Sequence, residues 1–127
     1  MTNESLARSY LIKAEKRLKA LATLRDEDAH SDVVREAQEL VELALKGRDV
    51  GGLLVEHGAK FVPAVRERLA RAAEISRRLR RERELALYGD IDFIPTEQYS
   101  AVDAQRAYDE AAWVLALAQE AIRPLSR

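Results

Sequence analysis

Apolar residues recur at helical spacing in four long segments of this chain, and no segment shows the alternation of apolar and polar residues that is typical of a β-strand. The predicted helices cover about residues 4–23, 33–46, 63–87 and 101–123. Short loops between helices of this length favour antiparallel neighbours. The sequence therefore predicts an all-α fold, an antiparallel bundle of four to five helices, in which residues 1–127 form a single domain.

The predicted helices have apolar faces that should pack in a common core. In the first helix this face holds Leu6, Tyr10, Ala14, Leu18 and Leu21. In the last helix it holds Val102, Ala104, Tyr108, Ala111, Ala112, Leu115 and Ile122, with Trp113 beside it. The candidate helix starts are Asn3, Ser31 or Asp32, Pro63, and the pair Ser100 and Asp103, which has the spacing of a capping box.

The second predicted helix ends in a sequence that is typical of a C-cap. Gly47 follows Lys46, and residues 49–61 then form a short glycine-bearing segment with a brief helix or turn in it. Gln38, Glu42 and Lys46 recur every four residues along one ridge. Spacing alone favours a solvated ridge, with Glu42 and Lys46 placed to form an ion pair within the helix.

The composition excludes several classes of protein. Hydrophobic residues make up 47% and charged residues 34% of the 127 residues, as in a folded, soluble domain. The net charge of −1 gives no overall attraction to nucleic acid or to a membrane, so any nucleic-acid site must be a local cluster. The chain has no cysteine, which excludes disulfides, thiolate nucleophiles and cysteine-rich zinc sites.

The sequence contains no pattern that predicts a cofactor site, a membrane span or a signal peptide. His30 and His57 lie far apart without the spacing of metal ligands, so we interpret them as surface or capping residues and expect no metal and no cofactor. No run of about 18 apolar residues predicts a membrane span. The N-terminal residues lack the pattern of a signal peptide, and we expect a cytoplasmic protein.

The apolar face of the third predicted helix is interrupted near its end. Leu69, Ala72, Ile75 and Leu79 share that face, but the next positions on it are Glu82 and Arg83. A charged residue at a core position costs free energy unless it is paired or opens onto a cleft. Because broken local rules concentrate at functional sites, we predict a polar cleft here, with Glu82 and Glu84 in it.

The same helix carries the densest cluster of arginines in the chain. Candidate residues for binding nucleic acid or a nucleotide are Arg77, Arg78, Arg81 and Arg83, together with Tyr88. A phosphate backbone would be attracted to such a cluster. The alternative is a solvated helix surface with internal ion pairs to the interspersed glutamates.

Three stretches of the chain are similar to a known family. AQELVELALKG, with Ala37, Gln38, Glu42 and Lys46, resembles the second-helix signature of the HEPN domain, the nucleotide-binding domain named for higher eukaryotes and prokaryotes. DVGGLL resembles the segment that follows it, and LRRERELALYGDIDFIP with the helix after it resembles a prokaryotic branch of the family. The resemblance covers nearly the whole chain. Arg48 stands where relatives often have histidine, and the connection between the second and third helices is shorter than usual.

The resemblance implies a bundle of four to five helices that forms a homodimer, with the third helix near the dimer axis. Many HEPN proteins are metal-independent ribonucleases of toxin–antitoxin and defence systems. Others are inactive partners of small nucleotidyltransferases. The ribonuclease motif is an arginine, four to six residues, and a histidine, commonly followed two residues later by tyrosine.

This motif maps onto Arg81, Ala86 and Tyr88, so the arginine and tyrosine are present and the histidine is absent. Metal-free RNA cleavage needs a group that accepts the 2′-hydroxyl proton near neutral pH, and alanine cannot do this. The leading hypothesis is therefore a non-catalytic homodimer that binds a nucleotidyltransferase partner, RNA or a nucleotide. The alternatives are an active ribonuclease toxin that uses Arg81, with Glu82 or Glu84 as base, and a purely structural dimeric bundle.

Overall fold

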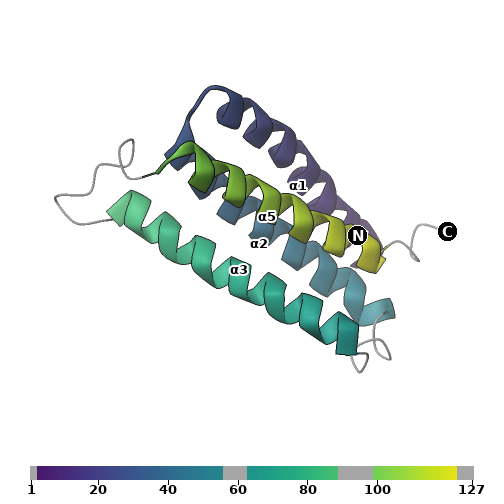
Figure 1. Cartoon of the computed structure of the whole chain (residues 1–127). Coiled ribbons are helices and arrows are strands. Elements are labelled where there is room, and N and C mark those ends of the chain that lie inside the picture. Colours follow the sequence, from purple (N-terminus) through teal and green to yellow (C-terminus); the bar gives the residue numbers. More distant parts are fainter. Residues whose placement is uncertain (1–2, 56–62, 89–98, 123–127) are drawn as a thin grey trace.

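Four helices make up the part of the chain that the structure describes (Figure 1). The computed structural model describes residues 3–55, 63–88 and 99–122, and the side chains of residues 5–49, 67–82 and 99–120. The helices are α1 (Asn3–Asp26), α2 (His30–Val55), α3 (Pro63–Tyr88) and α5 (Ala101–Ile122). The described ranges contain no strand, so the all-α prediction is confirmed.

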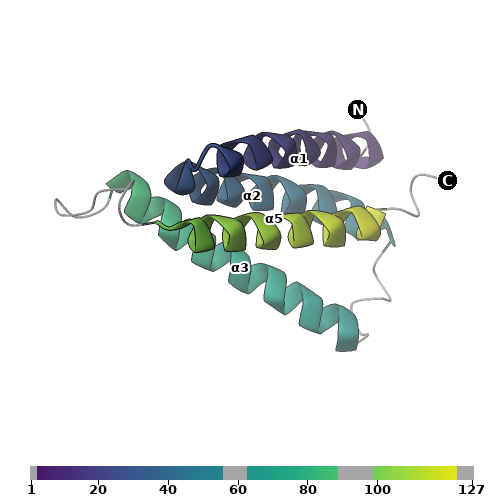
Figure 2. The same cartoon turned by 45° about the horizontal axis from the view of Figure 1, so that its top comes forward.

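Successive helices run in opposite directions, as predicted for an antiparallel bundle (Figure 1). α2 lies at the centre and contacts each of the other three helices, and α1 also packs on α5. α3 packs mainly on α2 and contacts α5 much less. Figure 2 shows α3 crossing the other helices at an angle, with its Pro63 end turned away from α5. No helix within the described residues has the length and apolarity that a membrane crossing requires.

The core forms between α1, α2 and α5, with one face of α3 added to it. Ala72, Ile75 and Leu79 of α3 are buried, as the apolar face of that helix predicts. The core face of α1 is rotated slightly from the predicted one. Ala7 and Leu11 are buried, whereas Leu6 and Tyr10, which we predicted for the core, are only half-buried.

The predicted start and end of α2 are both wrong. The helix begins at His30, so Ser31 and Asp32 lie inside it and do not cap it. The helix does not end at Gly47 but continues to Val55, so residues 49–55 belong to it, and 56–62 lie outside the described residues. Gly47 has a packing role instead, because a Cβ atom there would lie 2.8 Å from Leu11 Cδ2 and 3.1 Å from the carbonyl oxygen of Ala7. The absence of a side chain thus lets α1 and α2 approach closely.

The ridge of Gln38, Glu42 and Lys46 is not a solvated one. The side chain of Gln38 faces the core, and the residue is only 1% exposed. Glu42 pairs with Arg80 of α3, with 3.6 Å between the Glu42 Oε1 and Arg80 Nη2 atoms, and so links two helices. Only Lys46 is exposed to solvent as the ridge predicted.

The start of α5 confirms the predicted capping box. The Ser100 backbone N–H donates to Asp103 Oδ2 at 2.9 Å, and the Asp103 backbone N–H donates to Ser100 Oγ at 3.3 Å. These bonds satisfy two donors at the helix start that have no partner within the helix. Val102, which follows the cap, is 77% exposed, so its predicted core position is wrong.

We expect Ser100→Ala to lower the free energy of unfolding by about 1 kcal/mol, because it removes the side chain that caps α5. Urea denaturation followed by circular dichroism measures this loss. Ser9→Ala is the matched control, since Ser9 is exposed within α1, and it should change stability by less than about 0.5 kcal/mol. Equal effects of the two substitutions would contradict a capping role for Ser100.

Candidate functional site

The interruption in the apolar face of α3 is filled by a hydrogen-bonded pair. The Tyr99 hydroxyl lies 2.8 Å from Glu82 Oε2 and 3.0 Å from the backbone oxygen of Glu82. Tyr99 is 8% exposed and packs where α3 and α5 meet, and Glu82 is half-buried. A carboxylate at the edge of the core is thus stabilised by a hydroxyl donor from the segment that precedes α5.

The surroundings of Tyr99 favour the neutral form of its hydroxyl. Burial raises the pKa of Tyr99 well above its ordinary value of 10.0, and the hydrogen bond to Glu82 and the negative charges of Glu82 and Asp103 raise it further. The tyrosine therefore remains a hydrogen-bond donor to Glu82 throughout the neutral and mildly alkaline range.

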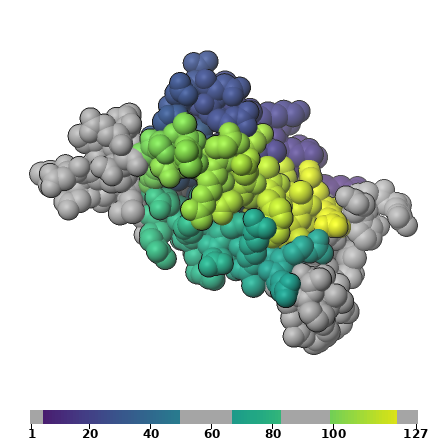
Figure 3. Space-filling view, viewed as in Figure 1, coloured from purple at the N-terminus to yellow at the C-terminus, as the bar shows by residue number. Residues whose placement is uncertain are grey.

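A groove runs between α3 and α5 on the face seen in Figure 3, where the two helices meet at the surface. Its larger part has a volume of about 700 Å³ and is bordered by Arg71, Ile75 and Arg78 of α3 and by Val102, Arg106 and Glu110 of α5, among others. A second hollow of about 250 Å³ is bordered by Glu82, Tyr99 and Asp103. Arg78 and Arg106 border both, so the two hollows adjoin.

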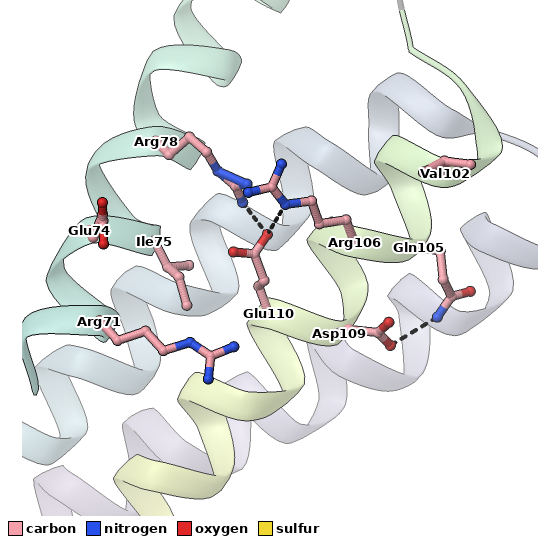
Figure 4. A pocket seen from close by; sticks show the side chains of 9 residues that line it. All are labelled: Arg71, Glu74, Ile75, Arg78, Val102, Gln105, Arg106, Asp109 and Glu110. Carbon is pink, nitrogen blue, oxygen red and sulfur yellow. Dashed lines mark hydrogen bonds and ion pairs between the residues drawn. The ribbon is translucent and has the colours of Figure 1, made fainter. Parts of the chain in front are cut away.

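Glu110 lies between two arginines at the middle of this groove (Figure 4). Arg78 of α3 forms an ion pair with Glu110 through Nη2, and Arg106 Nε lies 3.3 Å from the same carboxylate oxygen. The side chains of Glu110 and Arg78 are 15% and 27% exposed. Arg78 Nε is buried and has no hydrogen-bond partner among the described residues.

Further polar contacts join α3 to α5 along the rest of their length. The Arg71 guanidinium lies 4.4 Å from the centre of the Trp113 ring, a cation–π contact. Arg68 Nη1 lies 2.9 Å from Glu120 Oε2 in an exposed ion pair. These two helices are therefore joined largely by long charged side chains, which leaves the space between them open to solvent.

Two of the predicted binding residues lie on the outer face of α3. Arg77 and Arg81 are exposed and stand one helical turn apart. Neither forms an ion pair with another side chain of the described residues, in contrast to Arg68, Arg78 and Arg80. Arg78 differs from the predicted arrangement because its guanidinium is engaged by Glu110 and lies in the groove.

Some candidate side chains do not belong to the described part of the chain. Arg83, Glu84, Ala86 and Tyr88 belong to α3, but their side chains lie outside the described residues. His57 also lies outside them, and His30 is half-buried at the start of α2. Among the residues that are described, no three acidic, histidine or cysteine side chains gather as a metal site would require.

Sequence reasoning missed four residues of this region: Arg71, Tyr99, Arg106 and Glu110. A signal existed for Arg106 and Glu110, because they stand four residues apart on one helix. No local pattern connects Tyr99 to Glu82 or Arg78 to Glu110, since these contacts join different helices or the segments next to them.

Comparisons of the chain with family models, curated proteins and solved structures find no match.

Proposed function

We propose that this chain is a non-catalytic, HEPN-like helical module that forms a homodimer and binds RNA through the outer face of α3. The observation that carries the RNA-binding part is the pair Arg77 and Arg81. Both guanidinium groups are exposed, and neither is neutralised by a carboxylate of the described side chains. Such groups attract the phosphates of a nucleic-acid backbone without regard to sequence.

The proposal that the protein is not a ribonuclease depends on the identity of one residue, Ala86. Ala86 occupies the position that a histidine holds in the ribonuclease motif that this chain resembles. The stretch that resembles the motif keeps the arginine and the tyrosine but lacks the histidine, the residue suited to accept the 2′-hydroxyl proton near neutral pH. The homodimer is implied by the same resemblance, and light scattering should give twice the chain mass of 14.3 kDa.

We expect the double substitution Arg77→Gln with Arg81→Gln to weaken binding of a single-stranded RNA oligonucleotide by about 10-fold at low salt, because two phosphate contacts are lost. The slope of log Kd against log salt should fall by roughly 0.7 for each arginine. Fluorescence anisotropy with a labelled oligonucleotide measures both quantities. Arg77→Gln alone and Arg68→Gln form the matched comparison, since each removes one positive charge from α3 and Glu120 already pairs Arg68.

Three results would count against the proposal. Equal losses of affinity in Arg68→Gln and in Arg77→Gln, which remove the same charge, would show that net charge, and not this face of α3, decides binding. Cleavage of RNA in metal-free buffer at neutral pH, abolished by Arg81→Ala, would show that the protein is a ribonuclease. A monomeric mass in solution would contradict the dimer.

A further inference from the structure

Two arginines of the α3–α5 groove meet at its centre, and a third, Arg71, borders it and stacks on the Trp113 ring. Figure 4 shows Arg78 and Arg106 meeting at Glu110, with the Arg71 guanidinium directed toward α5 below them. The Glu74 carboxylate lies apart from this group, and Asp109 instead accepts a hydrogen bond from Gln105 Nε2 at 2.9 Å. Two guanidinium groups and one carboxylate therefore meet at the centre of the groove, and Arg71, Glu74 and Asp109 border it around them.

We propose that this groove is a binding site for a small organic phosphate, held by Arg71, Arg78 and Arg106. Arginine binds phosphate oxygens through pairs of parallel N–H donors, and the ion pairs with Glu110 use only one nitrogen of Arg78 and one of Arg106. The site is distinct from the outer face of α3 that we propose for RNA, because Arg77 and Arg81 do not border the groove.

The size and lining of the groove indicate the class of ligand. A volume of about 700 Å³ lies within the range of small-molecule sites, which is roughly 300–1,000 Å³. Ile75 and Val102 supply apolar surface beside the arginines, and Val102 is 77% exposed, so its side chain is free to cover a ligand. A phosphate monoester or diphosphate with an apolar or aromatic body fits this combination.

Glu110 occupies the position of the ligand's anionic group when the site is empty of phosphate. Its carboxylate neutralises part of the charge of Arg78 and Arg106 and keeps their guanidinium groups together. A bound phosphate would compete with Glu110 for these donors. Removing the carboxylate charge should therefore strengthen phosphate binding, and removing a guanidinium should weaken it.

The test measures binding of inorganic pyrophosphate, inorganic phosphate and phenyl phosphate to the full chain by isothermal titration calorimetry. We expect Arg106→Gln to weaken pyrophosphate binding by about 10- to 100-fold, which is the effect of one charge-assisted hydrogen bond. Glu110→Gln should strengthen it by about 10-fold, because two guanidinium groups lose their competing carboxylate. Phenyl phosphate should bind more tightly than inorganic phosphate, since its ring adds apolar contact.

Glu120→Gln is the matched control. It removes one negative charge and one α3–α5 ion pair outside the groove, so pyrophosphate binding should change less than about twofold. Arg106 is largely exposed, so Arg106→Gln should fold, and circular dichroism of each variant checks this.

Several outcomes would overturn the proposal: no binding of pyrophosphate or phenyl phosphate at millimolar concentration, equal binding in Arg106→Gln, or weaker binding in folded Glu110→Gln. A fourth outcome would assign the groove to RNA. In that case an RNA oligonucleotide would displace pyrophosphate and would itself lose affinity in Arg106→Gln.

Discussion

Gly47→Val should lower the free energy of unfolding by about 2–3 kcal/mol, the effect of overpacking a well-filled contact between helices. A Cβ at this position would already lie 2.8 Å from Leu11 Cδ2, and the Ala7 carbonyl oxygen at 3.1 Å is backbone that cannot turn aside. The gain in helix propensity from replacing glycine is smaller, at roughly 0.5 kcal/mol for a β-branched residue. Thermal and urea denaturation at one protein concentration measure the difference.

A second substitution separates packing from propensity. Leu11→Ala removes the side chain that the new atoms would strike, so the double variant should lose less stability than the sum of the two single variants. Ala116→Val is a control at an exposed helical position of α5 and should cost less than about 1 kcal/mol. An unchanged or higher stability of Gly47→Val would contradict the close approach of α1 and α2.

Tyr99→Phe should lower the free energy of unfolding at neutral pH by about 1–3 kcal/mol, because the half-buried Glu82 carboxylate loses its hydroxyl donor. Urea denaturation at pH 7 measures this loss. Tyr10→Phe is the control, since Tyr10 is a half-buried tyrosine of α1, and its effect should be smaller. Equal effects of the two substitutions would contradict the bond to Glu82.

The same pair predicts how stability depends on alkaline pH. The pKa of Tyr99 is higher in the folded protein than its unfolded value near 10, so the folded state retains the proton that the unfolded state releases. The stabilisation is therefore fully present below about pH 10 and is lost as the pH rises from there toward the folded pKa.

Wild type should consequently lose more stability than Tyr99→Phe between about pH 9 and pH 11. Comparing the two proteins cancels the contributions of lysines and of the other tyrosines, which both retain. Parallel curves of unfolding free energy against pH would show that Tyr99 titrates normally in the folded protein.

Patterns within single segments predicted the helices well. The third helix was predicted at 63–87 and spans Pro63–Tyr88, and its residues Ala72, Ile75 and Leu79 are buried as their spacing required. The capping box of Ser100 and Asp103 was also recognised, because its chemistry involves residues only three positions apart. These features depend on the period of the helix and on hydrogen bonds near its ends.

Gly47 and Gln38 show where such patterns fail. Glycine after lysine is typical of a helix end. Here α2 continues past Gly47, and glycine stands at this position because α1 packs too closely to leave room for a side chain. Gln38 belongs to a ridge that looks polar in sequence, yet the residue is buried because α2 contacts three other helices and has little surface left for solvent.

The candidate sites were also predicted only in part from the sequence. The sequence located the arginines of α3 and the interruption at Glu82, but it could not show that Arg78 pairs with Glu110, that Tyr99 donates to Glu82, or that Arg77 and Arg81 remain exposed.

The sequence by itself determined that the described residues fold as helices and where α3 and α5 begin, because hydrophobic period and capping act over a few neighbouring positions. Only the tertiary structure decided which charged side chains pair across helices and which face solvent. Those outcomes depend on the rotation and crossing of α3 against α2 and α5, which no local pattern encodes.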